Sequence, residues 1–259
     1  MSIISTDKWL IKSYDRPIEM CKKLEDYFEG ASASEIYEYL SMSGMYHPLE
    51  NGKKVIQTLK QNRVWEVVEE EKRKLQKEWD GPNIPIFIFP SHTADPEFNR
   101  VFNGKAGLAY HDKLFLFIAG HNSEKEIKSL FTHEYNHVCR LSKFQKHEDN
   151  YVLLDTIILE GIAENAVRER FGEDFISKWT NNYSDEELEN LWKTFVLPNR
   201  NIQKNHPKHE QLLYGIGNYP ELLGYCVGYY LVKQFLVEKN LTTKDLMPME
   251  PAKIARIHN

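Results

Sequence analysis

The sequence predicts an α+β protein that is predominantly helical, with a small mixed sheet over one helix that carries chemistry. Segments with apolar residues at helical spacing fill most of the chain. Short apolar runs bounded by proline or glycine are typical of buried strands. The segment FTHEYNHVCRL at 131–141 places two histidines four residues apart within a helical pattern. Together these observations indicate a mainly helical fold with one chemically distinctive helix.

Residues up to about Asp80 are predicted to be helical. Pro17–Phe28 and Ala33–Met42 carry apolar residues at helical spacing, and Gly30 stops the first of these segments. A long, highly charged helical stretch follows at Pro48–Trp79. Its run of charges is typical of a solvated helix face, so we expect no chemistry in this part of the chain.

After the turn sequence DGPN at 80–83 the pattern changes to strands. Ile84–Phe89 is a short apolar run typical of a buried strand. Gly107–Tyr110 and Leu114–Ala119 flank His111, which we interpret as a turn residue of a hairpin. The second run of this hairpin is either an exposed edge to which an extended substrate adds as a strand, or a plain core strand.

Two long helices follow the hairpin. The first begins near Ser123, with Glu126 three residues later as a capping box, and continues to about Lys143. The second covers Tyr151–Phe171. The later polar stretch Asn199–His209 is predicted to be a mobile loop. Its histidines, His206 and His209, are either substrate contacts or ordinary solvated side chains.

The helix at 123–143 contains the candidate metal ligands. His133 and His137 are four residues apart, so their side chains lie on one helical face, one turn apart. Two imidazoles in this arrangement can bind one zinc ion at about 2.0–2.1 Å. Glu134 follows the first histidine, where a carboxylate can take a proton from water. The alternative is a helix that places these residues together by chance.

The helix at 151–171 carries two carboxylates on an apolar stripe. Glu160 and Glu164 fall on one line with Leu153, Ile157 and Val167. A buried carboxylate is costly unless it is paired or binds a metal. Glu160 is therefore the candidate third zinc ligand, and Glu164 would hold the N–H of a ligating histidine. The alternative is that both glutamates are solvated.

The last long helix, Pro220–Lys239, combines glycines and tyrosines. Gly224 and Gly228 are four residues apart, which gives a flat strip on which another helix can pack closely. Gly161, beside Glu160 in the helix at 151–171, likewise lacks a side chain, so another helix could approach there. Tyr225 could place its hydroxyl in the site and stabilise an oxyanion. The alternative is that Tyr225 only fills the core.

Composition excludes several classes of function. The net charge of −5 and pI of about 6.1 give no reason to expect binding to nucleic acid or an anionic membrane. The N-terminal segment lacks the apolar core of a secretory signal, and no stretch reaches the ~20 apolar residues of a membrane span. The three cysteines, Cys21, Cys139 and Cys226, fit reduced thiols, so we expect a cytoplasmic protein. Cys139 is expected to be a packing residue.

With the motifs HEYNHVCR, LEGIAE and GYCVGYYLV in order, the chain from about Ile84 onward resembles the YjaZ-like predicted zinc-dependent proteases of bacteria. These belong to the gluzincin type of metallopeptidase. The resemblance implies a zincin-like fold with His133, His137 and Glu160 as metal ligands and Glu134 as general base. It also implies a catalytic region at 82–259, preceded by a helical region at 1–81, within one continuous globular unit.

Two further positions match the family pattern. Glu164 corresponds to the acidic residue one turn after the third ligand, where aspartate is more usual. Arg140 matches an arginine after the HExxH motif, and we place both residues around the metal ligands. The connection from His137 to Glu160 is longer than in thermolysin-like enzymes. The resemblance therefore implies the metal ligands, whereas the shape of the cleft can differ.

The sequence thus predicts a zinc-dependent metallopeptidase that hydrolyses peptide bonds in a peptide or protein substrate. Structural zinc sites are usually closed by four protein ligands and rich in cysteine. Three ligands with an adjacent glutamate favour catalysis instead. The alternatives are a non-catalytic zinc-binding or chaperone-like module on a zincin scaffold, and a zinc hydrolase of non-peptide amides.

Overall fold

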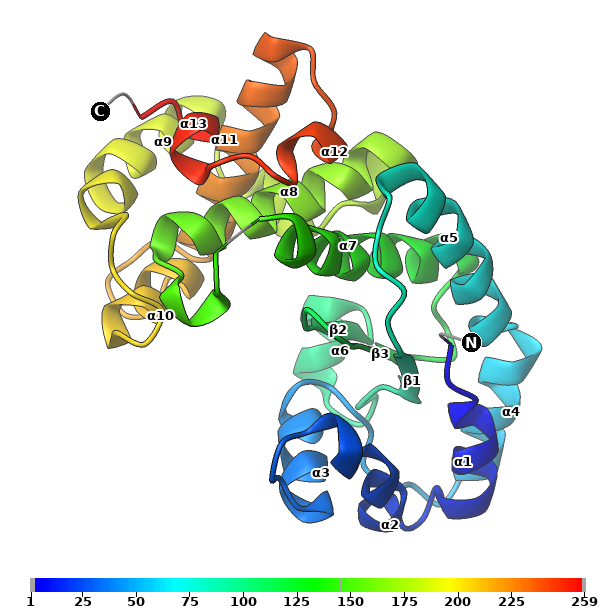
Figure 1. The fold of residues 1–259 in the computed structure, drawn as a ribbon. Coiled ribbons are helices and arrows are strands. Elements are labelled where there is room, and N and C mark those ends of the chain that lie inside the picture. Colours follow the sequence, from blue (N-terminus) through cyan, green and yellow to red (C-terminus); the bar gives the residue numbers. More distant parts are fainter. Residues whose placement is uncertain (1–2, 145, 258–259) are drawn as a thin grey trace. The chain divides into compact units, whose positions relative to one another are not determined.

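The computed structural model describes residues 3–144 and 146–257 (Figure 1). The chain divides into two compact units, Met1–Val138 and Cys139–Asn259, here called the first and second unit. The described residues form many helices and one small three-stranded sheet, which confirms the predicted α+β class with its predominance of helix. The expected functional boundary at residue 82 stays a prediction. None of the helices in the described residues has the length and apolar character needed to cross a bilayer.

The helices of the first unit largely follow the predicted segments. They are α1 (Thr6–Ser13), α2 (Pro17–Cys21), α3 (Ala33–Met42), α4 (Gly52–Gln61), α5 (Val64–Trp79), α6 (Pro96–Phe102) and α7 (Glu124–Lys143), the last of which continues into the second unit.

The helical stretch predicted at 48–79 contains two helices, α4 and α5. They are separated where Arg63 adopts a left-handed backbone conformation with φ of +53°. A single left-handed residue cannot continue a right-handed helix, so the chain changes direction there.

The sheet contains β1 (Ile86–Pro90), β2 (Lys105–Ala109) and β3 (Leu114–Ile118) in the order β1-β3-β2. β1 is parallel to β3, and β2 is antiparallel to it, so the sheet is mixed and the predicted hairpin is confirmed. Of the two alternatives for Leu114–Ala119, an exposed edge or a core strand, the structure shows the core strand. β3 pairs with a strand on each side and its residues are fully buried, so it is a core strand, while β2 lies at an edge.

Aromatic side chains cover one face of the sheet. Phe87 and Phe89 of β1 lie beside Phe115 and Phe117 of β3, and the rings of Phe87 and Phe115 stack with centroids 4.9 Å apart. These four side chains belong to one core cluster with buried residues of α1 to α3. Since strand side chains alternate between faces, the other face is left to the aliphatic residues of β1 and β3 and to Gly107 of β2.

The second unit is built around a helix pair. Its α-helices are α8 (Leu153–Phe171), α9 (Asp185–Leu191), α10 (Pro207–Tyr214), α11 (Leu223–Lys239), α12 (Thr243–Leu246) and α13 (Pro251–Ile254). The end of the stretch predicted to be a loop at 199–209 is instead the start of α10, with Pro207 at its first position.

Glycines bring α8 and α11 into backbone contact. A Cβ added to Gly161 would lie 2.3 Å from the carbonyl oxygen of Gly228, and one added to Gly228 would lie 2.0 Å from that of Ile157. The side chain of Asn165 links the same helices, because its Nδ2 donates to the carbonyl oxygens of Gly161 (2.8 Å) and Tyr229 (3.1 Å). The predicted close helix packing at these glycines is confirmed.

Candidate metal centre

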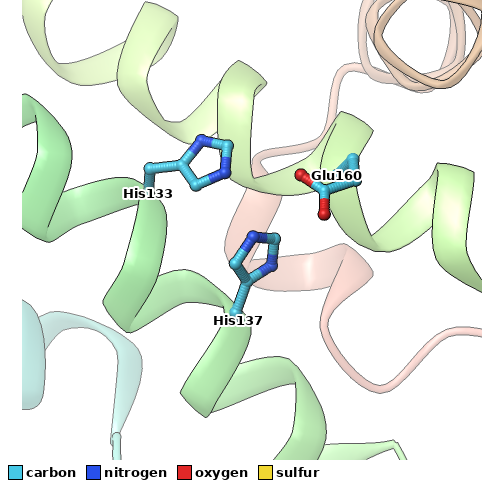
Figure 2. A group of neighbouring side chains, drawn as sticks. All are labelled: His133, His137 and Glu160. Carbon is cyan, nitrogen blue, oxygen red and sulfur yellow. The ribbon is translucent and has the colours of Figure 1, made fainter. Parts of the chain in front are cut away.

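Three side chains converge as the motif predicts. His133 and His137 extend from α7, and Glu160 extends from α8 with its carboxylate toward the two rings (Figure 2). The ring centroids of the histidines are 4.7 Å apart, with the planes at 87°. One ligand atom from each residue lies within 4.8 Å of the others. Among the described residues, this is the one group of three or more potential ligands that could hold a metal ion.

The local sequence accounts for this placement. Ser123 and Glu126 form the predicted capping box at the start of α7, with the Ser123 N–H donating to Oε2 of Glu126 at 2.8 Å. The regular helix that follows places His133 and His137 on one face, one turn apart. His137 is buried, and His133 and Glu160 are half-buried.

The donor set fits zinc. Two imidazoles and one carboxylate are a recurring set of protein ligands at catalytic zinc sites. Ligand atoms about 2.0–2.1 Å from a tetrahedral metal lie about 3.3 Å from one another. Donors already within 4.8 Å need only small side-chain rotations to reach that spacing. His133, His137 and Glu160 are therefore the residues that would hold the metal.

The side chain of Glu134 packs against the backbone of the edge strand β2 at Gly107. Glu134 is 8% exposed. A Cβ added to Gly107 would lie 2.4 Å from both Cγ and Cδ of Glu134 and 2.7 Å from its Oε1. A larger residue at position 107 would therefore displace either the Glu134 side chain or the strand. Sequence reasoning did not single out Gly107, although a glycine within a strand is a known signal of close approach.

Glu164 lies one turn after Glu160 on α8. It is 2% exposed and accepts a hydrogen bond from the backbone N–H of Ser177 at 2.5 Å. This bond gives the buried carboxylate a partner and joins α8 to the segment that follows it. The expected support of a ligating histidine by Glu164 stays a prediction.

Arg140 has structural contacts that the sequence did not indicate. It is 1% exposed, and its Nη1 donates to the carbonyl oxygens of Leu246 (2.8 Å), Met247 (2.7 Å) and Met249 (2.7 Å). Its guanidinium also lies 4.1 Å from the ring centre of Phe144. Burial lowers the pKa of Arg140 to about 10, so the side chain stays charged at neutral pH. Arg140 thus ties α7 to the carbonyl groups at the end of α12.

Tyr225 is half-buried and has two aromatic neighbours. Its ring lies edge-to-face with Trp179, with centroids 5.5 Å apart, and 5.7 Å from the ring of Tyr214. Burial raises the pKa of Tyr214, a hydrogen bond with Tyr225 opposes this rise, and the charge of Glu160 adds to it. Tyr214, at the end of α10, is therefore a second hydroxyl that is electrostatically coupled to the third ligand. No motif in the sequence marks it.

The remaining candidate histidines lie in other surroundings. His111 is an exposed turn residue, as predicted. His206 precedes α10, and its Nδ1 accepts from the N–H of Lys208. The expectation that His209 is solvated or contacts substrate is wrong, because it is 2% exposed and its Nε2 hydrogen-bonds to Oγ1 of Thr156 at 3.1 Å. His209 lies on the buried face of α10, together with Leu212 and Leu213.

All three cysteines are buried free thiols. Burial raises the pKa of Cys21 and of Cys226 to about 12, which keeps both thiols protonated. Cys139 is fully buried, in agreement with its predicted role in packing.

Comparisons with known proteins agree with the motif. A family model described as "Predicted Zn-dependent protease (DUF2268)" matches residues 64–256. The chain is 35% identical to "Uncharacterized protein YjaZ" of Bacillus subtilis (strain 168) over 248 residues, which cover 95% of each protein. It is 24% identical to "Uncharacterized protein YjfC" of the same organism over 213 residues, 76% of this chain and 70% of that protein. No solved structure matches the chain. The chain therefore belongs to the YjaZ-like family of predicted zinc-dependent proteases.

Proposed function

We propose that the protein is a zinc-dependent metallopeptidase of the gluzincin type, on a zincin-like scaffold, that hydrolyses peptide bonds in a cytoplasmic peptide or protein substrate. The observation that carries the proposal is the convergence of His133, His137 and Glu160, with Glu134 next to the first ligand in the sequence. Family membership supports the same reaction class.

When bound, zinc would supply Lewis acidity, lowering the pKa of a water molecule and polarising the carbonyl of the scissile bond. Glu134 would act as general base. Its carboxylate takes a proton from the attacking water and then passes this proton to the nitrogen of the leaving amine. Contact with β2 restricts the positions that this carboxylate can adopt, as a proton-transferring group requires.

The hydroxyl groups of Tyr225 and Tyr214 are candidates for a second task. The carbonyl oxygen of the substrate gains negative charge during attack, and a correctly placed hydrogen-bond donor stabilises that charge. Tyr225 is the candidate donor predicted from the sequence. Tyr214, hydrogen-bonded to it, would either orient its hydroxyl or donate directly. Glu164 would support a ligating imidazole from one turn beyond Glu160.

Two observations favour catalysis over a purely structural metal. The site offers three protein ligands, whereas a structural zinc site usually has four, and two of the three are half-buried and so partly accessible to solvent. A non-catalytic zinc or chaperone-like module, or a hydrolase of non-peptide amides, would use the same ligands. The experiment described next separates these functions.

The test compares zinc content and peptide cleavage in the full chain. Elemental analysis should show that His137→Ala and Glu160→Ala each lose one zinc equivalent relative to wild type, whereas the exposed-residue control His111→Ala loses none. Wild type should cleave members of a peptide library, and Glu134→Gln should keep its zinc and lose cleavage at least about 100-fold.

The outcomes separate the alternatives. Zinc binding without cleavage of any peptide would indicate a binding module. Cleavage restricted to non-peptide amides would indicate the other hydrolase. Full zinc occupancy in both ligand variants would contradict the metal centre itself.

A further inference from the structure

A second pair of histidines lies in the first unit. His47 and His92 have ring centroids 4.5 Å apart and planes at 74°. The pair His133 and His137 has nearly the same arrangement, 4.7 Å and 87°. His47 and His92 line a cavity of about 470 Å³, whose other walls come from α3 and from the beginning of α6. Two imidazoles with this mutual geometry, open to a cavity, are a candidate ligand pair.

The backbone holds these two histidines together. The N–H of His92 donates to the carbonyl oxygen of Gly44 at 2.9 Å, and the N–H of Tyr46 donates to that of Pro90 at 3.0 Å. Between these bonds, Met45 and Ser91 form an antiparallel bridge. The segment that carries His47 is thus paired with the segment that carries His92. Their proximity follows from this pairing and does not depend on side-chain conformation alone.

Tyr37 contacts one ring nitrogen of His47. The Tyr37 hydroxyl lies 3.0 Å from Nδ1 of His47 and 3.4 Å from the carbonyl oxygen of Tyr46, to which it can only donate. In either tautomer of His47, Nδ1 faces this hydroxyl, so Nε2 is the nitrogen left for a metal. A partner that fixes the second nitrogen in this way is usual for histidine ligands of metals.

We propose that His47 and His92 form a second metal site, which binds one divalent transition-metal ion such as zinc. Imidazole nitrogens suit zinc, copper and nickel. Glu38 and Asp95 line the same cavity, but in the described residues no third ligand atom lies within reach of both imidazoles, so water would fill the other positions. With two imidazoles as its main ligands, the site binds zinc more weakly than the centre formed by His133, His137 and Glu160.

The test is a zinc titration of the metal-free full chain against a competing fluorescent chelator. Wild type should bind two equivalents with different affinities. His47→Gln and His92→Gln should each lose the weaker equivalent and keep the tighter one. His137→Ala should do the opposite, and His111→Gln, an exposed histidine outside both sites, should match wild type. Tyr37→Phe should weaken the second site about tenfold, as loss of a partner of a ligating histidine does.

A second measurement does not depend on any variant. In NMR spectra of the histidine side chains, the ring signals of His47 and His92 should shift as the second equivalent is added. Two equivalents in His92→Gln, or ring signals that stay unchanged beyond the first equivalent, would overturn the proposal. Because the weaker equivalent is assigned independently of the tighter one and of any cleavage, the result does not depend on the proposed peptidase activity.

Discussion

The carboxyl group of Glu134 occupies the space that a side chain at Gly107 would fill. A methyl group at residue 107 would come within 2.4 Å of Cγ and Cδ of Glu134, well inside van der Waals contact. Either the glutamate or the edge strand β2 would have to move. The position of the proposed general base on α7 is therefore constrained by a residue of β2, which precedes α7 in the chain.

Gly107→Ala should lower kcat/KM about 100-fold and leave zinc content unchanged. The reason is that a shift of about 1 Å in a proton-transferring group is enough for such a loss. Steady-state kinetics on a cleaved peptide, together with elemental analysis, measure both quantities. Ala106→Ser, on the opposite face of the same strand, is the control. An unchanged kcat/KM in Gly107→Ala would mean that Glu134 relocates without penalty.

Gly228→Ala should destabilise the protein by up to about 2 kcal/mol. Alanine improves helix propensity by about 1 kcal/mol, but overpacking costs about 1–3 kcal/mol, and here the new methyl group meets a carbonyl oxygen at 2.0 Å that belongs to the backbone of α8. The steric cost should prevail. Urea unfolding measures the change, with the exposed Val237→Ala on the same helix as control. Stabilisation by Gly228→Ala would show that α8 and α11 separate readily.

Arg140→Met should destabilise the protein by at least about 2 kcal/mol with no loss of zinc. The buried carbonyl groups of Leu246, Met247 and Met249 would lose a charged donor, and an unsatisfied buried acceptor costs about 1–3 kcal/mol. Urea unfolding and hydrogen exchange of residues 246–249 measure this effect. The reverse result, unchanged stability with lost zinc, would instead support the role around the metal ligands that the family resemblance implies.

His209→Gln should reduce the loss of stability at mildly acidic pH. Burial lowers the pKa of His209 below its usual 6.5. Folding therefore favours the neutral ring, and its contribution to the free energy of unfolding is fully present above pH 6.5 and is lost as the pH falls through the lowered value. Glutamine stays neutral and can keep the bond to Thr156.

Urea unfolding of metal-free protein between about pH 7.5 and about pH 5 measures this difference. The difference in stability between wild type and His209→Gln should shift in favour of the variant toward the acidic end. Equal pH dependence in the two proteins would exclude His209 as the group responsible.

Tyr225→Phe should lower kcat by about 100-fold with KM nearly unchanged, because its hydroxyl is proposed to act on charge that develops only in the transition state. Tyr214→Phe should have a smaller effect in the same direction, since it removes the hydrogen-bond partner of Tyr225. Tyr230→Phe, which removes a hydroxyl of α11 that bonds to Glu189, is the matched control. If Tyr225→Phe behaves like this control, Tyr225 is only a packing residue.

Much of the site could be predicted from the sequence because its signals are local. The spacing of His133 and His137 places them on one face of a helix in any fold that keeps the helix. Glu160 interrupts an apolar stripe, which marks a carboxylate that needs a partner. Glycines at helical spacing likewise predicted the contact between α8 and α11, because a helix face without side chains lets another helix backbone approach closely.

Other features depend on segments that meet only after folding. The sequence contains nothing near Gly107 that points to Glu134, and nothing near His47 that points to His92. The position of β3 between two strands, and the burial of His209 against Thr156, are likewise outcomes of pairing between distant segments.

The sequence by itself determined the helical class, the spacing of the candidate ligands and the family, because helical periodicity and ordered motifs depend only on neighbouring residues. The tertiary structure decided which strand lies at the edge, which carboxylate lies against it and which tyrosines meet near the third ligand. These are matters of long-range packing, where a close approach is possible only if both surfaces have the right shape.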